Sequence, residues 1–330
     1  MKRLLFMIIL GAALLLCACG GPDPAEESGL PAQTLPVPEP ADGTMAALGV
    51  TPDNYPRIDG STSTLGMVRA IFENVYGESF DEDDYPQQAS KTVPSYDMLI
   101  KGDVDLILVP YASPEVRQQA EDAGVELEYA KVAAEALIFI TPAENSAEGI
   151  TGDQARAIYL HNAVASWSEL GGPDRALVPL CRNADSGSQS QLDNLVLRGE
   201  SMDPGIRENY VELTMEGMLE QTAFYHNGGL NGSPSDCYAL GYTLFTYLQN
   251  ADRITGIGQS LKILDFEGVA ATAETIADGT YPLADGYYAV VRADLPPDHP
   301  ARAVIRWLLS PAGCAALTER GFLPASPQED

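Results

Sequence analysis

Positive charge is scarce in this sequence. Its 47 aspartates and glutamates face only 19 lysines and arginines, and the formal net charge is −28. A chain this acidic repels the phosphates of nucleic acids and the headgroups of an anionic membrane surface. We therefore expect no nucleic-acid partner and no membrane binding through the protein's own charge.

Histidine is scarce too, and the usual catalytic motifs are missing. His161, His226 and His299 lack the His-x-x-x-His spacing of a helical metal site. The Gly-x-Ser-x-Gly turn of serine hydrolases is absent as well. We therefore expect a protein that is not an enzyme, with no catalytic residue, no cofactor and no metal. A serine hydrolase remains the enzyme alternative.

A single apolar run, Leu4 to Leu16, follows Lys2 and Arg3. It is too short to span a bilayer and has the form of a signal-peptide core. It ends in "LCACG" (16–20), which resembles a bacterial lipobox. We expect residues 1–18 to be a signal peptide and Cys19 to carry lipid; the alternative is an ordinary secretory signal. Residues 19–48, rich in Pro, Ala, Glu and Gly, are predicted to be a flexible tether.

The remaining chain alternates strands with helices, which indicates an α/β fold. "DVDLILVPY" reads as a buried strand, and a helix is expected after it from Pro114 to Gly124. Thr151 is a predicted helix cap, and a C-terminal helix is expected from about His299 to Arg320. Cys181, Cys237 and Cys314 allow one disulfide at most, and the sequence does not choose a pair.

Two strands are followed by small hydroxylated turns that lead into predicted helices. These turns are Gly60–Thr64 and Arg182–Gln189, and Ser95, before "YDMLIKG", is a weaker third. The first amides of a helix are unpaired and carry partial positive charge, so such turns can bind anions. Arg182 adds a planar fork of donors for an oxyanion. The simpler interpretation of each turn is a helix cap without a ligand.

Several segments, in this order, resemble the phosphate-binding lipoproteins of ABC transporters, within the periplasmic-binding-protein superfamily. They are "IDGSTSTLGMVRAIF", "GITGDQARAIYLHNAVASWSELGG", "RNADSGSQ", "YPLADGYYAVVR" and "RWLLSPAGCAALTERGFLP". The resemblance covers about residues 55 to 325. It implies a two-lobed α/β fold whose lobes are joined by crossover strands and close on a ligand. The implied lobes are 49–136 with 283–330, and 137–282.

The resemblance also implies which residues bind the ligand. Hydroxyl and backbone donors would come from both lobes, and Arg182 would supply the guanidinium. The implied ligand-binding residues are Ser61, Thr62, Ser63, Ser95, Arg182, Ser186, Gly187, Ser188 and Gln189.

One departure concerns the carboxylate that accepts the proton of bound phosphate in the best-known family members. They carry an aspartate after the second strand of the first lobe, where residues 109–115 of this chain read "VPYASPE" and contain no aspartate. An unpaired carboxylate would repel sulfate, which has no proton to offer. Four residues are candidate replacements: Asp59, Asp97, Glu115 and Asp185.

We therefore predict an extracytoplasmic lipoprotein that captures phosphate between two lobes for an ABC permease. It would be a monomer, held to the bacterial cell membrane by its N-terminal lipid. Two alternatives stay open: a receptor for another oxyanion such as sulfate, and a signalling lipoprotein on the same fold.

Overall fold

The computed structural model describes residues 43–77, 80, 82–225 and 236–325. The predicted signal peptide, Cys19 and His226 lie outside these residues, as does most of the predicted tether. Within the described part, no helix combines the length and the apolar character needed to cross a membrane.

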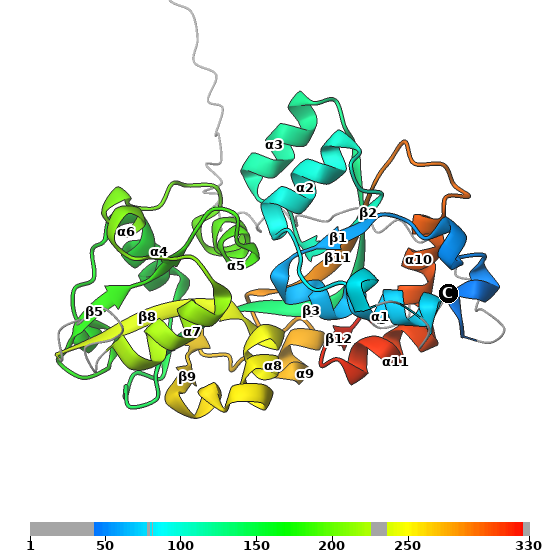
Figure 1. Cartoon of the computed structure of the whole chain (residues 1–330). Helices are drawn as coiled ribbons and strands as arrows, with labels where there is room; N and C mark the ends of the chain where they lie inside the picture. The colour runs from blue at the N-terminus through cyan, green and yellow to red at the C-terminus, as the bar shows by residue number, and fades with distance from the viewer. Residues whose placement is uncertain (1–42, 78–79, 81, 226–235, 326–330) are drawn as a thin grey trace, which may run out of the picture. The chain divides into compact units, whose positions relative to one another are not determined.

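Eight of the described strands form one mixed sheet in the order β1-β2-β11-β3-β8-β5, with β9 and β12 also paired to β3 (Figure 1). Two further pairs, β4 with β10 and β6 with β7, lie outside it. The strands are β1 (Ile58–Gly60), β2 (Leu106–Pro110), β3 (Leu127–Pro142), β4 (Gly149–Ile150), β5 (Ala176–Pro179), β6 (Cys181–Arg182), β7 (Val211–Glu212), β8 (Cys237–Leu244), β9 (Leu261–Ile263), β10 (Asp265–Phe266), β11 (Ala284–Arg292) and β12 (Leu323–Pro324).

The long strand β3 connects the two parts of the sheet. Its first half pairs antiparallel with β11, and its second half pairs antiparallel with β8 and β9. Every residue from Val132 to Pro142 is buried, which explains its almost continuous apolar sequence. The sequence predicted only the segment "ALIFITP" as a strand here, because the polar residues Glu128, Lys131 and Glu135 interrupt the apolar pattern before it.

Helices cover the sheet and begin at polar caps or prolines. The Thr151 hydroxyl accepts the Gln154 amide at the start of α4, as predicted. The helices are α1 (Leu65–Tyr76), α2 (Thr92–Lys101), α3 (Pro114–Asp122), α4 (Gly152–His161), α5 (Gly187–Gln191), α6 (Pro204–Asn209), α7 (Met215–Phe224), α8 (Phe245–Thr255), α9 (Ala273–Ala277), α10 (Pro300–Leu308) and α11 (Pro311–Glu319). The π-helix Leu192–Leu197 continues α5 directly.

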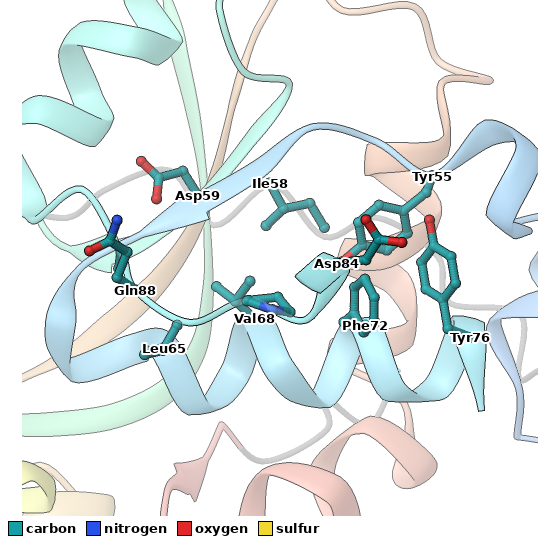
Figure 2. A pocket seen from close by; sticks show the side chains of 11 residues that line it. Tyr55, Ile58, Asp59, Leu65, Val68, Phe72, Tyr76, Asp84 and Gln88 are labelled. Atoms are coloured by element: carbon teal, nitrogen blue, oxygen red, sulfur yellow. The ribbon is translucent and has the colours of Figure 1, made fainter. Parts of the chain in front are cut away.

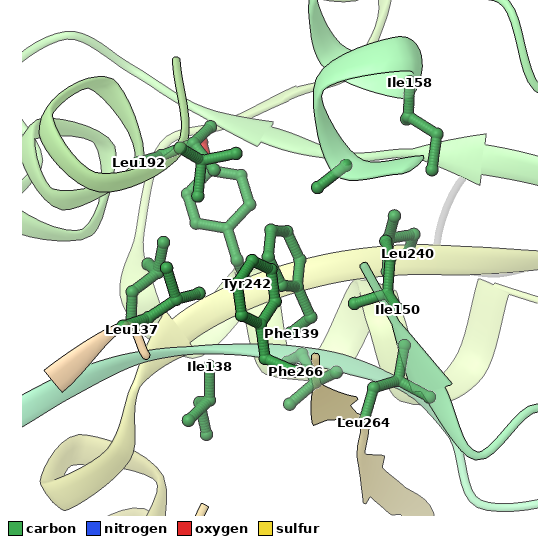
Figure 3. Packing of buried hydrophobic residues seen from close by; sticks show 14 of the residues in the cluster. Leu137, Ile138, Phe139, Ile150, Ile158, Leu192, Leu240, Tyr242, Leu264 and Phe266 are labelled. Carbon is green, nitrogen blue, oxygen red and sulfur yellow. The ribbon is translucent and has the colours of Figure 1, made fainter. Parts of the chain in front are cut away.

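Buried apolar residues gather in two large clusters. One draws on residues 134 to 283 and includes Tyr159. Figure 3 shows Phe139 and Tyr242 within it. The other draws mainly on residues 45–133 and 287–322, with Met215 and Leu244 added. Trp167 belongs to the first cluster and Trp307 to the second, so both tryptophans are packing residues.

Two predictions about local structure need correction. The single C-terminal helix is in fact two, α10 and α11, because Pro311 has no amide hydrogen to continue the first and Ser310 caps the second. The second helix of the chain starts at Thr92, not after Ser95. Pro94 is tolerated there because its missing amide falls in the first turn, where amides are unpaired. Cys181, Cys237 and Cys314 are not joined to one another by a disulfide.

Candidate functional site

The start of α5 lies directly against the end of β2 and the start of α2. A Cβ atom added to Gly187 would lie 2.7 Å from both Pro110 Cγ and Thr92 Oγ1. The Val93 amide also faces the Asp185 carbonyl oxygen, at 3.5 Å. Only a glycine allows this approach. Two predicted donor segments that lie far apart in the sequence thus meet the same strand end.

Thr92, at the start of α2, has a buried hydroxyl without a hydrogen-bond partner among the described residues. The residue is 1 % exposed, and its Oγ1 atom has no hydrogen-bond partner among the described residues. Leaving a buried hydroxyl unpaired is unfavourable. The sequence assigned this role to Ser95, so Thr92 was missed. No local signal separated Thr92 from Ser95, because a proline is tolerated in the first turn of a helix as well as before it.

Ser95 itself lies in the first turn of α2 with its hydroxyl already engaged. Its Oγ atom is 2.6 Å from the Lys91 carbonyl oxygen, 2.7 Å from the Gly60 carbonyl oxygen and 3.1 Å from Asp59 Oδ2. A hydroxyl has one proton to donate. The structure therefore uses Ser95 to tie α2 to the end of β1.

The turn after β1 is a short 3-10 helix, Thr62–Thr64, that leads into α1. The Ser61 amide donates to the Leu108 carbonyl of β2 over 3.0 Å, and Ser61 Oγ lies 2.9 Å from Ser63 Oγ. Ser61 is buried, Ser63 is half-buried and Thr62 is exposed. The turn is thus anchored on β2, the same strand that contacts Gly187, and the exposed Thr62 and half-buried Ser63 are its most accessible hydroxylated residues.

Arg182, in β6, is 6 % exposed. Its Nε donates to the Glu212 carbonyl over 3.0 Å and its Nη2 to the Leu213 carbonyl over 3.3 Å. These bonds use two of the five N–H donors of a guanidinium. Burial lowers the pKa of Arg182, but a guanidinium keeps its charge at neutral pH.

The α5 segment is held by a chain of polar contacts behind Arg182. The Tyr242 hydroxyl accepts the Arg182 amide over 2.8 Å and donates to Gln189 Oε1. Gln189 Nε2 then donates to Asp193 Oδ1 over 2.9 Å. Gln189 therefore positions the segment. Ser186 and Ser188 are both buried and share a hydroxyl–hydroxyl contact of 3.0 Å.

The four candidate replacements for the missing carboxylate contact other protein groups or lie in exposed positions. They are Asp59, Asp97, Glu115 and Asp185. Asp59 accepts the Ser90 amide, and Asp97 pairs with Lys101. Glu115 is exposed in the first turn of α3, and Asp185 is half-buried beside Asn183. The described residues hold no cluster of histidine, cysteine, aspartate and glutamate suited to a metal ion.

Two carboxylates in strands, the buried Glu135 and the half-buried Asp285, escaped the sequence interpretation. Glu135, in β3, is 2 % exposed. Asp285 opens β11, and the Tyr288 hydroxyl donates to it over 2.8 Å. Burial raises the pKa of both groups.

A pocket of about 490 Å³ lies elsewhere, between α1 and the segment 84–89. Figure 2 shows its aromatic wall of Tyr55, Phe72 and Tyr76. None of the predicted ligand-binding residues lines this pocket. It is therefore separate from the donor segments that meet at β2.

Comparisons with known proteins point to one family. A family model described as a PBP superfamily domain matches residues 47–312. The phosphate-binding protein PstS of Borreliella burgdorferi is 26 % identical over 193 residues, which cover 57 % of this chain and 63 % of that protein. The match thus spans less than two thirds of the relative's length.

Solved structures share the fold. One is an ABC-type phosphate transport receptor from Vibrio cholerae, with a TM-score of 0.58 and 20 % identity over 81 % of this chain and 98 % of its own. Another, from Clostridium perfringens, is assigned as a phosphate ABC transporter substrate-binding protein and contains bound phosphate. Its TM-score is 0.58 at 19 % identity, over 81 % of this chain and 98 % of its own. At these identities the likeness establishes the two-lobed α/β fold.

Proposed function

Because the chain belongs to the PBP superfamily, we propose that it is an extracytoplasmic receptor that binds phosphate between two lobes and delivers it to an ABC permease. The names of its relatives support phosphate as the ligand. A receptor of this kind holds its ligand by non-covalent contacts, and we propose no catalytic step.

The observation that carries this proposal is the meeting of α5, α2 and the Ser61–Thr64 turn around the end of β2. Each contributes small hydroxyls, and α5 also contributes the amides of its first turn. The unpartnered Thr92 hydroxyl facing Gly187 is a donor that a bound oxyanion would satisfy. A few charge-assisted hydrogen bonds of roughly 1.5–3 kcal/mol each suffice for micromolar affinity.

The ligand-binding residues of this proposal are Thr62, Ser63, Thr92, Arg182 and the Ser186–Ser188 segment. Ser95 and Gln189 would act by positioning, because their side chains already bind protein atoms outside the donor segments. Ser61 would hold the turn on β2, because its amide donates to the Leu108 carbonyl. Arg182 would offer its remaining donors and its charge.

The proposed lobes are residues 49–136 with 283–330, and residues 137–282. The two large clusters of buried apolar residues divide close to these limits, which supports them. The strand β3 would then cross from the first lobe to the second, and the chain would return just before β11. The second lobe would carry Arg182 and α5, and the first would carry the other donor segments.

We also propose that lipid on Cys19 holds the protein to the membrane as a monomer. The sequence around Cys19 supports this. Metabolic labelling with a fatty acid should mark the wild-type protein and leave a Cys19→Ser variant unlabelled. Equal labelling of both would remove Cys19 as the attachment site.

The proposed function is tested by calorimetric titration of the full-length chain in detergent, after unfolding and refolding to remove bound anion. Phosphate binding at micromolar or lower Kd would support it. Sulfate binding of equal strength would indicate a general oxyanion receptor. A folded protein that binds neither anion would overturn the proposal and favour a signalling role.

Arg182→Ala should weaken phosphate binding by at least about tenfold, because roughly 1.4 kcal/mol of charge-assisted bonding is lost. Calorimetry measures the affinity, and thermal unfolding of the anion-free variant reports the separate effect of losing the bonds to Glu212 and Leu213. A variant that binds as well as the parent would remove Arg182 from the site.

A further inference from the structure

Gln191, the last residue of α5, has a buried side-chain amide that binds no described residue. The residue is 2 % exposed, and neither its Nε2 nor its Oε1 has a hydrogen-bond partner among the described residues. Burying an amide in this way is unfavourable, because its donors and its acceptor lose water and gain nothing in return. The position therefore suits a ligand that can both accept and donate hydrogen bonds.

Helical spacing places Gln191 on the face of α5 that meets the end of β2. Gly187 lies four residues earlier, on the same face, and a Cβ atom there would lie 2.7 Å from Thr92 Oγ1. Gln189 lies about 200° around the helix from Gln191, and its side chain accepts the Tyr242 hydroxyl of β8. The two glutamines therefore face opposite sides of α5, and Gln191 faces the segments of the first proposed lobe.

The direction of helical side chains turns the Gln191 amide back towards the start of α5. A helical side chain covers the turn on the N-terminal side of its own Cα atom. That turn begins at Gly187, which has no side chain to obstruct the amide. Thr92 Oγ1, which is also buried and unpartnered, approaches the same turn. Each proposed lobe thus brings one unpartnered polar side chain to the start of α5.

We propose that Gln191 is a ligand-binding residue whose amide lets the site accept tetrahedral oxyanions both with and without a proton. This inference rests on the proposed function. The amide oxygen can accept the proton of hydrogen phosphate, and the amide nitrogen can donate to an oxygen that carries none. Rotation of the amide exchanges the two. The site then lacks the penalty that an unpaired carboxylate would impose on sulfate.

The two carboxylates in strands β3 and β11 are already bound by protein donors. Glu135 Oε1 accepts the Thr246 amide of α8 over 3.0 Å. Asp285, which pairs with Glu135 in the β11–β3 register, accepts the Tyr288 hydroxyl over 2.8 Å. Both atoms of the Gln191 amide, in contrast, remain available to an anion.

The first test compares the affinities of the full-length chain for phosphate and for sulfate by calorimetry at neutral pH. Wild type should bind the two anions with affinities within about tenfold of each other. Gln191→Glu places a carboxylate beside the anion, so it should tolerate hydrogen phosphate and weaken sulfate binding by at least about 100-fold. Gln259→Glu is the control, because it adds the same charge at an exposed position. It should keep the wild-type ratio.

Gln191→Met provides a second variant if the buried charge of Gln191→Glu prevents folding. Methionine has a similar unbranched shape and no strong hydrogen-bonding group. Affinity for both anions should therefore fall by about tenfold. The anion-free variant should be as stable as the parent or more so, because the unpaired amide has been removed. Unchanged affinity for both anions would overturn the inference.

The competing interpretation is that Gln191 links α5 to Asp285 on β11. Burial raises the pKa of Asp285, and the Tyr288 hydroxyl and the nearby Gln191 amide oppose this rise. A structural link of this kind predicts that Gln191→Met is less stable than the parent in the absence of any anion. It also predicts an unchanged ratio of sulfate to phosphate affinity in Gln191→Glu. Either result would overturn the inference.

The wild-type titrations distinguish this inference from the proposed function. Wild type that binds phosphate but not sulfate would overturn the inference and keep the proposed site. Folded wild type that binds neither anion would overturn both. Binding of both anions, with loss of sulfate alone in Gln191→Glu, is the result expected from an amide that meets the anion directly.

Discussion

Thr92 is the residue whose structure most directly implies a ligand. Its neighbours bury the hydroxyl without giving it a partner, and burial of an unpaired hydroxyl destabilises a protein by about 1–3 kcal/mol. Threonine is therefore a poor choice for stability alone, and valine has nearly the same shape. A bound oxyanion would convert the unfavourable hydroxyl into a hydrogen-bond donor.

Thr92→Val should lower phosphate affinity by about tenfold, because one donor to the anion is lost. The same change should leave the anion-free protein as stable as the parent or more so. Calorimetry and thermal unfolding measure the two effects separately. Thr243→Val is a matched control, since Thr243 is 1 % exposed in β8 and its hydroxyl is also unpartnered among the described residues. Thr243→Val should affect the stability of the anion-free protein as Thr92→Val does, but it should leave the affinity for phosphate unchanged. Equal affinity in both variants would exclude Thr92 from the site.

At this scale the sequence predicted residue types better than residue roles. Gly187 and Ser186 were correctly placed at a helix start, because a glycine and a serine after a strand have few other uses. The sequence assigned to Ser95 the role that the structure gives to Thr92, because the position of Pro94 within the first turn cannot be read from spacing. Glu135 was missed because a buried acid in an apolar run is indistinguishable from an exposed one until its partners in α8 and β11 are known.

The π-helix Leu192–Leu197 carries Asp193, a carboxyl group whose pKa is strongly raised. Burial raises the pKa of Asp193 to about 6, the nearby charge of Glu115 adds to the rise, and the Gln189 hydrogen bond opposes it. The folded protein therefore binds this proton more tightly than the unfolded chain, whose aspartate titrates near 3.9. Folding stability from this group is greatest below pH 4 and falls as the pH rises through 6.

Asp193→Asn should remove this dependence while keeping an oxygen for Gln189. Its free energy of unfolding, relative to wild type, should rise between pH 4 and pH 7 by on the order of 2 kcal/mol. Denaturant titration of the anion-free protein at several pH values measures it. Asp278→Asn should show the opposite sign, because hydrogen bonds from Thr280 lower the pKa of Asp278. Parallel curves for wild type and Asp193→Asn would contradict the expected burial of this charge.

The sequence predicted the boundaries of elements that are fixed by contacts between nearby residues. It did not predict boundaries that depend on contacts with distant parts of the chain. Thr151 and Gln154 fix the start of α4 by themselves, and that start was predicted. The length of β3 depends on its neighbours, because β11 pairs with its first half and β8 and β9 pair with its second half. No local pattern announces a strand of that length. Its polar residues are compatible with strand only because those neighbours bury or pair them.

At the scale of the whole molecule, the proposed lobes touch through α3 and the π-helix. Asn194 Nδ2 donates to the Ala112 carbonyl over 3.1 Å, and Arg117 Nη1 donates to Asn194 Oδ1 over 3.2 Å. Arg117 also donates to the Ala112 carbonyl. None of these three residues belongs to the donor segments around β2. They join the lobes beside the site and would favour the conformation in which its two halves meet.

Asn194→Ala should therefore weaken phosphate binding without removing any group that contacts the anion. Two hydrogen bonds of roughly 0.5–1.5 kcal/mol each stabilise the joined lobes. Losing them should shift the population towards separated lobes and weaken binding by about tenfold. Most of the change should be a faster release of phosphate, measured by stopped-flow fluorescence, because the contact forms only after the lobes meet.

The control is Gln118→Ala, whose side chain lies on α3 beside Arg117 and contacts Asp122 within that helix. It should leave the release rate unchanged. Thermal unfolding with and without phosphate distinguishes an effect on lobe closure from an effect on folding. If Asn194 acts in closure, Asn194→Ala should have the melting temperature of the parent when phosphate is absent. Its melting temperature should be lower than that of the parent when phosphate is present. Equal loss in both conditions would assign Asn194 to the stability of the fold, and lobe closure would then depend on the anion and the segments that bind it.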